Sequence, residues 1–185
     1  MSRSVAALAL GAALPLTALP AHAGSAATNF TITARVSGIC VGISASNTTV
    51  DYDPLQVNGA AGTDLYGSGT IQMRCLVGTV VDILMSFSVN TVGGQRRLVS
   101  GTNALNYALY PPTSGATNAP CNVSAPPSTQ WKNTSAGTAG VDFLRTTPFT
   151  GLFGVRTFNY CVHVPRGQWV PTGVYTDSII ATVNF

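Results

Sequence analysis

Charged side chains are scarce in this chain. Of its 185 residues, only 8% are Asp, Glu, Lys or Arg, about a third of the usual share. Glutamate is absent, and Lys132 is the only lysine. Because Glu, Lys and Gln favour helices while Thr suits strands, this composition predicts an all-β protein.

The shortage of acids and bases also argues against several functions. His163 is the only histidine after residue 23, so few groups could act as a general base. Asp51 and Asp53 could form a carboxylate pair, but a turn explains Asp-Tyr-Asp-Pro better. Arg96 and Arg97 form too short a basic run, without interleaved aromatics, for a nucleic-acid site. We therefore predict no enzyme, no cofactor and no nucleic-acid partner.

The first 23 residues have the pattern of a signal peptide. Arg3 gives a positive start, residues 5–19 are apolar, and Ala21-His22-Ala23 is a small-x-small cleavage signal. No later apolar run approaches the ~20 residues of a membrane-spanning helix. We expect export and a mature chain that begins at Gly24, with eight basic and six acidic side chains.

Cysteine is also rare, but its count is informative. Cys40, Cys75, Cys121 and Cys161 form an even set in a chain expected to be exported. That count predicts two disulfides, for which three connectivities are possible. With no Cys-x-x-Cys spacing and a single histidine, a zinc site is improbable, and we predict no metal.

Alternation of apolar and polar residues recurs along the chain and predicts about seven short strands. The predicted strands lie in residues 29–36, 39–43, 70–75, 81–89, 105–110, 153–164 and 174–185. Residues 111–140, with many Pro, Ser and Thr, are expected to be an irregular excursion held by Cys121. The count of strands is typical of an immunoglobulin-like β-sandwich.

The last of these segments presents an apolar face up to its final residue. That face is formed by Tyr175, Ile179, Ala181, Val183 and Phe185. The pattern predicts a half-buried strand that ends the chain, whose edge is open and apolar. Such an edge is a liability unless another strand pairs with it.

Four motifs, in order, resemble the spore coat protein U domain of archaic, Csu-type chaperone–usher pilins. They are Cys40-Val41 with residues 70–78, Arg96-Arg97-Leu98 with Leu105-Asn-Tyr-Ala-Leu-Tyr110, residues 164–168 with 171–177, and Thr182-Val-Asn-Phe185. The similarity covers residues 30–185. The chain departs from the family pattern at Pro111-Pro112, where the excursion begins, and in its second pair of cysteines.

The resemblance implies an incomplete sandwich that lacks a final strand and accepts one from a partner by β-augmentation. In such pilins a periplasmic chaperone lends the strand first, and the N-terminal extension of the next subunit then replaces it. Here that donor would be residues 29–36, with Phe30, Ile32, Ala34 and Val36 as plugs, and the acceptor groove would lie beside Tyr175–Phe185. Pairing of residues 29–36 in cis, as the domain's own first strand, remains an alternative.

The resemblance also implies a Cys40–Cys75 disulfide, which leaves Cys121–Cys161 as the second. The expected organisation is a signal peptide at 1–23, a donor extension at 24–37 and the β-sandwich domain at 38–185. The expected function is a subunit of a surface pilus, exported through the periplasm with a chaperone and an outer-membrane usher, that polymerises with other pilins for adhesion and biofilm formation. The alternatives are a secreted coat or matrix protein that folds alone and, less favoured, a carbohydrate-active enzyme.

Overall fold

The computed structural model describes residues 31–35, 37–124, 130–133 and 135–185. It divides into two compact units, Met1–Arg35 and Val36–Phe185. In the first unit, residues 31–35 form no strand, contrary to the alternation there, and Ile32 is 81% exposed. The predicted signal peptide, Phe30 and Val36 lie outside the described residues.

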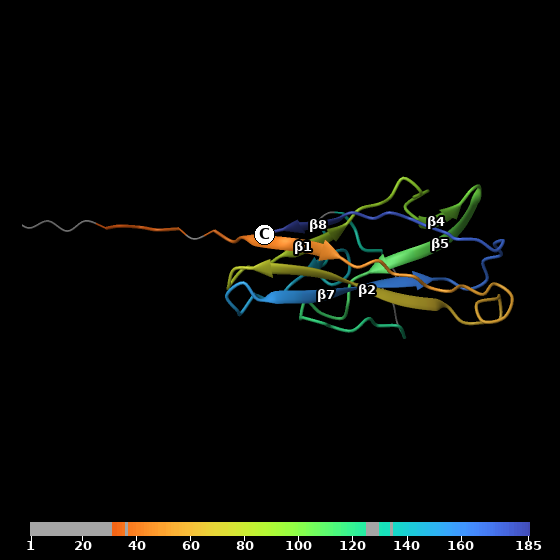
Figure 1. Cartoon of the computed structure of the whole chain (residues 1–185), viewed down its shortest axis with the longest axis horizontal. Coiled ribbons are helices and arrows are strands. Elements are labelled where there is room, and N and C mark those ends of the chain that lie inside the picture. The colour runs from red at the N-terminus through yellow and green to blue at the C-terminus, as the bar shows by residue number, and fades with distance from the viewer. Residues whose placement is uncertain (1–30, 36, 125–129, 134) are drawn as a thin grey trace, which may run out of the picture. The chain divides into compact units, whose positions relative to one another are not determined.

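The described residues of the second unit form eight strands, most of which are labelled in Figure 1. They are β1 (Cys40–Ala45), β2 (Leu65–Cys75), β3 (Asp82–Met85), β4 (Arg96–Ser100), β5 (Asn103–Tyr110), β6 (Leu144–Arg145), β7 (Val155–Val164) and β8 (Ala181–Asn184). The part of the chain that the structure describes contains no helix long and apolar enough to cross a membrane.

The strands form two antiparallel sheets. One has the order β1-β2-β7-β5-β4, and the other has the order β6-β3-β8. Alternate residues of β2, β5 and β7 face the smaller sheet and are buried, among them Ile71, Met73, Leu105, Leu109 and Phe158. The all-β, incomplete sandwich predicted from the sequence is confirmed.

The excursion contributes one side chain to the core that the sequence analysis did not single out. Trp131 is fully buried. Its indole Nε1 donates to the carbonyl of Ile83 at 2.8 Å, and its backbone N–H donates to the carbonyl of Leu109 at 2.7 Å. Trp131 therefore bridges β3 in one sheet and β5 in the other.

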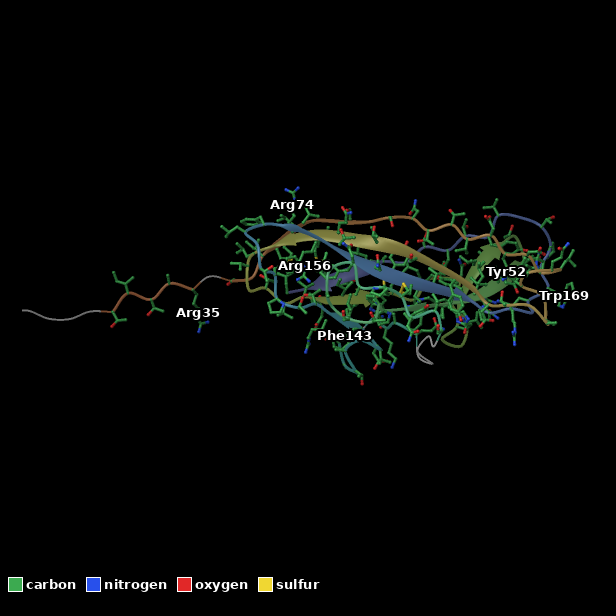
Figure 2. All side chains as sticks on the ribbon, turned by 90° about the horizontal axis from the view of Figure 1, so that it is seen from below. Arg35, Tyr52, Arg74, Phe143, Arg156 and Trp169 are labelled. Carbon is green, nitrogen blue, oxygen red and sulfur yellow. A yellow bond between two sulfur atoms is a disulfide. The ribbon has the colours of Figure 1, made fainter. Side chains whose placement is uncertain are left out.

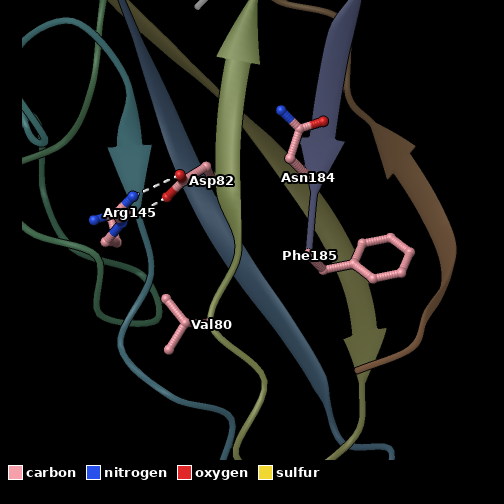
Figure 3. Close-up of a pocket in the computed structure, with 5 residues that line it drawn as sticks. All are labelled: Val80, Asp82, Arg145, Asn184 and Phe185. Atoms are coloured by element: carbon pink, nitrogen blue, oxygen red, sulfur yellow. Dashed lines mark hydrogen bonds and ion pairs between the residues drawn. The ribbon is translucent and has the colours of Figure 1, made fainter. Parts of the chain in front are cut away.

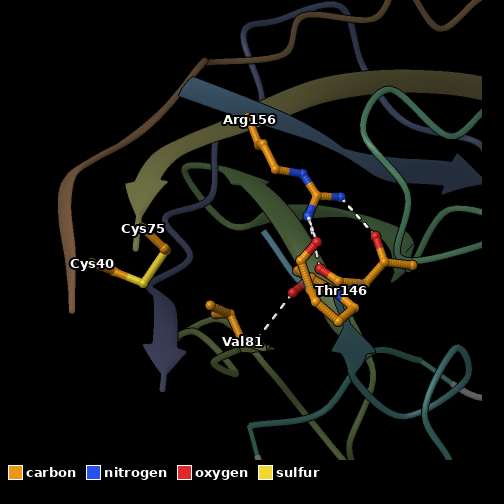
Figure 4. The surroundings of a disulfide bond; sticks show 7 residues. Cys40, Cys75, Val81, Thr146 and Arg156 are labelled. Carbon is orange, nitrogen blue, oxygen red and sulfur yellow. Dashed lines mark hydrogen bonds between the residues drawn. A yellow bond between two sulfur atoms is a disulfide. The ribbon is translucent and has the colours of Figure 1, made fainter. Parts of the chain in front are cut away.

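Both expected disulfides are present. Cys40–Cys75 joins β1 to β2 (Figure 4), and Cys121–Cys161 fastens the excursion to β7. They close loops with separations of 35 and 40 residues, so each contributes about 3–4 kcal/mol in the chain-entropy account. Near the first, the Thr146 hydroxyl accepts a hydrogen bond from the backbone N–H of Val81 at 3.0 Å.

β2 is longer than predicted, because it begins at Leu65, and two predicted strands are much shorter in the structure. The alternating run 81–89 forms a strand only to Met85, because local side-chain bonds turn the chain: Ser88 Oγ accepts from the N–H of Asn90, and Thr91 Oγ1 accepts from the N–H of Ser88. In residues 174–185 only Ala181–Asn184 is a strand. There the chain crosses from β4, where Thr176 pairs with Val99, to β3.

Candidate functional site: a groove between open strand edges

An open groove of about 560 Å³ lies on the inner face of the larger sheet. Its floor is made by core side chains of five strands, namely Ile71, Met85, Leu98, Tyr107, Leu109, Tyr160 and Val162. One wall is residues 45–50, which begin with the last residue of β1, and the other is formed by residues 174–179 and 181. Half-buried apolar side chains, among them Leu98, Tyr175 and Ile179, therefore line an open groove above the buried core.

The first wall lies where it does because β2 has two glycines beneath it. A Cβ on Gly67 would lie 2.5 Å from Cγ1 of Val50, and a Cβ on Gly69 would collide with Thr48 and with the ring of Tyr160. Only glycine lets the chain after β1 cross the face of β2 this closely.

Hydrogen bonds then hold this wall. The Tyr160 hydroxyl donates to the carbonyl of Ser46 at 2.6 Å and accepts from Thr48 Oγ1 at 2.8 Å. The backbone N–H of Ser46 also donates to the carbonyl of Thr70 at 2.8 Å. Residues 46–48 are thus attached to both β2 and β7.

The second wall keeps the predicted alternation although most of it is not a strand. Tyr175, Ile179, Ala181 and Val183 are half-buried and pack against the core, as expected, whereas Phe185 is mostly exposed. The predicted acceptor residues other than Phe185 therefore face inward. Tyr175, Ile179 and Ala181 line the groove itself.

Asp177 occupies an inward position of the same wall, where the sequence pattern would favour an apolar residue. Its carboxylate accepts hydrogen bonds from Ser88 Oγ at 2.8 Å, Asn90 Nδ2 at 2.9 Å and the Tyr107 hydroxyl at 2.7 Å. Burial raises the pKa of Tyr107 well above its ordinary value, and the hydrogen bond to Asp177 raises it further. Tyr107 therefore stays protonated and acts as a fixed donor that anchors the wall.

Arg96 stabilises the second wall through hydrogen bonds to the backbone that contacts it. Its buried guanidinium donates to the carbonyls of Met85 at 3.0 Å, Ser86 at 2.9 Å and Trp131 at 2.6 Å. Ser86 in turn donates its N–H to the carbonyl of Ile180 and accepts the N–H of Ile180 on its Oγ, each at 2.9 Å. Desolvation lowers the pKa of Arg96 from its very high ordinary value. The Arg-Arg motif thus contributes a structural residue that fixes the groove.

Two strand edges beside the groove are unpaired. Within the described residues, β1 pairs only with β2, and β8 pairs only with β3. The two strands run in opposite directions (Figures 1 and 3). Each edge strand presents free N–H and C=O groups, so an extended segment that enters between them could continue a β ladder.

The end of β8 borders a second, shallower hollow lined by Val80, Asp82, Arg145, Asn184 and Phe185 (Figure 3). Its two charged side chains pair with each other, since Arg145 Nε and Nη2 donate to the two Asp82 oxygens at 2.8 and 2.7 Å. The hydrogen bond to Asp82 raises the pKa of Arg145. This ion pair is therefore satisfied within the protein.

Two other polar residues singled out from the sequence, Asp53 and His163, have structural partners. Asp53 Oδ1 accepts the backbone N–H groups of Leu55 and Gln56 at 2.9 and 3.0 Å, which lowers its pKa, as the turn interpretation predicts. His163 Nε2 lies 2.9 Å from Asp64 Oδ2. Among the described residues no three potential metal ligands lie together.

The chain is similar to known proteins over most of its length. The family described as "Spore Coat Protein U domain" matches residues 26–182. "Protein U" of Myxococcus xanthus is 32% identical over 178 residues, which cover 90% of this chain and 88% of that protein.

Two solved structures show a looser likeness. One is from the CsuC–CsuE chaperone–tip adhesion subunit pre-assembly complex of the archaic chaperone–usher Csu pili of Acinetobacter baumannii, with a TM-score of 0.43 and 14% identity over 81% of this chain and 40% of that one. The other is from a chaperone–tip adhesin complex of CFA/I fimbriae, with a TM-score of 0.38 and 15% identity over 76% of this chain and 41% of that one. The chain thus spans about two fifths of these solved chains, and at these TM-scores the likeness assigns neither fold nor function.

Proposed function

The chain belongs to the Spore Coat Protein U domain family, and we propose that it is a structural subunit of a surface pilus assembled by donor-strand exchange. In this proposal the groove accepts an extended segment of another subunit. A periplasmic chaperone fills the groove before assembly, and an outer-membrane usher exports the growing fibre. The fibre then supports adhesion and biofilm formation.

The observation that carries the proposal is the apolar groove bordered by unpaired strand edges. A folded domain seldom leaves half-buried apolar side chains such as Leu98 and Ile179 along an open groove while two edge strands remain free. An inserted strand would cover the apolar floor and satisfy backbone groups of β8 at once, which is the energetic basis of β-augmentation.

The donor that fits this groove is the N-terminal segment of a neighbouring copy. Ile32 and Ala34 are exposed and belong to no strand, and with Phe30 and Val36 they form a stripe of period two. A stripe of this period places every apolar side chain on one face of an extended strand. Polar Thr31, Thr33 and Arg35 would face away from the floor.

A pair of substitutions on opposite faces of the donor tests the proposal. Ile32→Asp places a carboxylate against an apolar floor, which costs several kcal/mol, whereas Thr33→Asp keeps the charge in solvent. With the chaperone and usher present, we expect Thr33→Asp to form denaturant-resistant polymers and Ile32→Asp to remain unpolymerised. Equal polymerisation of the two variants would refute donor-strand exchange through this segment.

A second function, a secreted coat protein that folds alone, is favoured by the family description and by the name of the Myxococcus relative. Trp131 and the Cys121–Cys161 bridge add stabilising contacts independent of any partner. Expression without a chaperone separates the two. A stable monomer that does not bind a synthetic peptide of residues 24–36 is the result expected of a coat protein.

A further inference from the structure

Exposed apolar side chains gather on loops at two ends of the sandwich. One set, the distal patch, consists of Leu55, Val57 and Trp169, and Trp169 is 69% exposed. The other, the proximal patch, consists of Ile39, Val77, Leu152 and Phe153. Neither set takes part in the groove. Apolar clusters of this kind on a folded protein often mark contact surfaces.

The distal patch is carried by two loops that brace each other. Asn58, which is buried, accepts the N–H of Asp53 on its side chain and the N–H of Gly167 on its carbonyl, at 2.9 and 2.8 Å. The Gln168 side chain exchanges two hydrogen bonds with the backbone of Asn106, at 2.7 and 2.9 Å. Trp169 follows directly, so its indole projects from a fixed support.

The proximal patch is also held together by backbone bonds. The N–H of Leu76 donates to the carbonyl of Ile39 at 3.0 Å. The N–H of Gly78 donates to the carbonyl of Phe149 at 2.7 Å and so connects the two neighbouring loops. Phe153 has φ of 51°, in the left-handed region that bulky residues seldom adopt. The loop thus accepts backbone strain while its aromatic ring stays half exposed.

The patches lie at opposite ends of one strand. Leu152 and Phe153 precede β7 and Trp169 follows it, and the 10 residues of β7 span about 33 Å. Figure 2 shows Tyr52 and Trp169 at one end of the sandwich and Arg74, which precedes Cys75, at the other. A head-to-tail neighbour could therefore place one patch against the other.

The direction in which the donor strand enters the groove decides which ends of two neighbouring subunits meet. β1 has a bulge between Val41 and Ser44, whereas the pairing of β8 with β3 is regular. A donor therefore forms its ladder best with β8, and every strand pair in this fold is antiparallel. If the donor runs antiparallel to β8, its C-terminal end lies beside the start of the second wall, near residue 174. The donor therefore leaves the groove at the end that carries the Trp169 loop.

The linker between the donor segment and the β-sandwich of the same subunit is too short to keep neighbouring subunits apart. Only residues 37–39 separate Val36 from Cys40 at the start of β1, and four residue steps reach at most about 14 Å. Building on the proposed function, we infer that the distal patch of each subunit packs against the proximal patch of the copy that donates its strand. This contact is heterologous, so its repetition gives a filament and not a closed dimer.

The two tryptophans provide the test. Trp131 is fully buried and Trp169 is 69% exposed, so acrylamide quenching of the full exported chain reports on Trp169. In the control arm, excess synthetic peptide of residues 24–36 fills the groove without supplying a neighbour's body. We expect strong quenching in that arm, severalfold weaker quenching and a blue shift in the polymer, and little quenching of Trp169→Phe in either arm.

The outcomes separate the contact from donor-strand exchange. Polymers that form while Trp169 stays as quenchable as in the peptide-filled monomer would overturn the contact and leave the proposed function standing. Absence of polymers would overturn both. A photo-crosslinker in place of Trp169 should join the region of Leu152 in the next copy, whereas one at exposed Gln72, midway along β2, should not.

Discussion

Replacement of Arg96 by methionine is the sharpest test of how the groove is held in shape. The guanidinium is fully buried and donates to three backbone carbonyls, those of Met85, Ser86 and Trp131. Methionine fills a similar volume but leaves these oxygens without that donor, and each unsatisfied buried group costs about 1–3 kcal/mol. Part of this cost is offset because a buried charge disappears, so we expect a net loss of about 3–5 kcal/mol of unfolding free energy.

Arg97→Met is the matched control. Arg97 is half-buried, and its Nε donates to the carbonyl of Asn90 at 2.9 Å. We expect it to lose no more than about 1 kcal/mol. Urea unfolding of both variants with disulfides intact, followed by tryptophan fluorescence, in which buried Trp131 becomes exposed, measures the difference. If the two variants lose equal stability, Arg96 does not hold the groove as argued.

Two further predictions concern the groove and the response to acid. Gly69→Val should abolish binding of the donor peptide because its side chain would collide with Tyr160, whereas Gly151→Ala, whose Cβ would meet no atom within 4 Å, should bind normally in a titration. The backbone N–H of Arg166 holds the pKa of Asp64 below its ordinary value of 3.8. The ionised Asp64 therefore stabilises the folded state above pH 3.8, and this stabilisation is lost as the pH falls through the lowered pKa. Asp64→Asn should therefore flatten the decline of stability in acid, measured by thermal melts, and an unchanged slope would exclude this carboxylate as its source.

Alternation predicted the fold class and the positions of β2, β5 and β7 because those strands have one buried face. It failed in residues 81–89, where Phe87 continues the pattern but stacks on the Arg96 guanidinium at 4.6 Å after the strand has ended. The signal for that ending was present in the sequence, since Ser88 and Asn90 favour turns. Trp131 was missed for a different reason: a single core residue in an irregular segment has no periodicity.

The predicted acceptor residues lie along one wall of the groove, but the prediction did not include what fixes that wall. Tyr175, Ile179 and Ala181 line the groove, whereas the residues that anchor that wall are Asp177 and its partner Tyr107. A lone aspartate on the apolar side of an alternating run was the available signal, because a carboxylate is kept there only if donors surround it.

The wall that would receive a strand is thus held mainly by side chains and not by a ladder. Thr176 pairs with Val99, and Ala181–Asn184 pairs with β3. Between these points the bonds to Asp177 and the two to Ser86 hold the chain. A continuous β ladder would have placed this segment flat against β3 and closed the groove. Polar anchors at two points keep the wall in place while its apolar side chains stay accessible, and this is the condition that a donor strand requires.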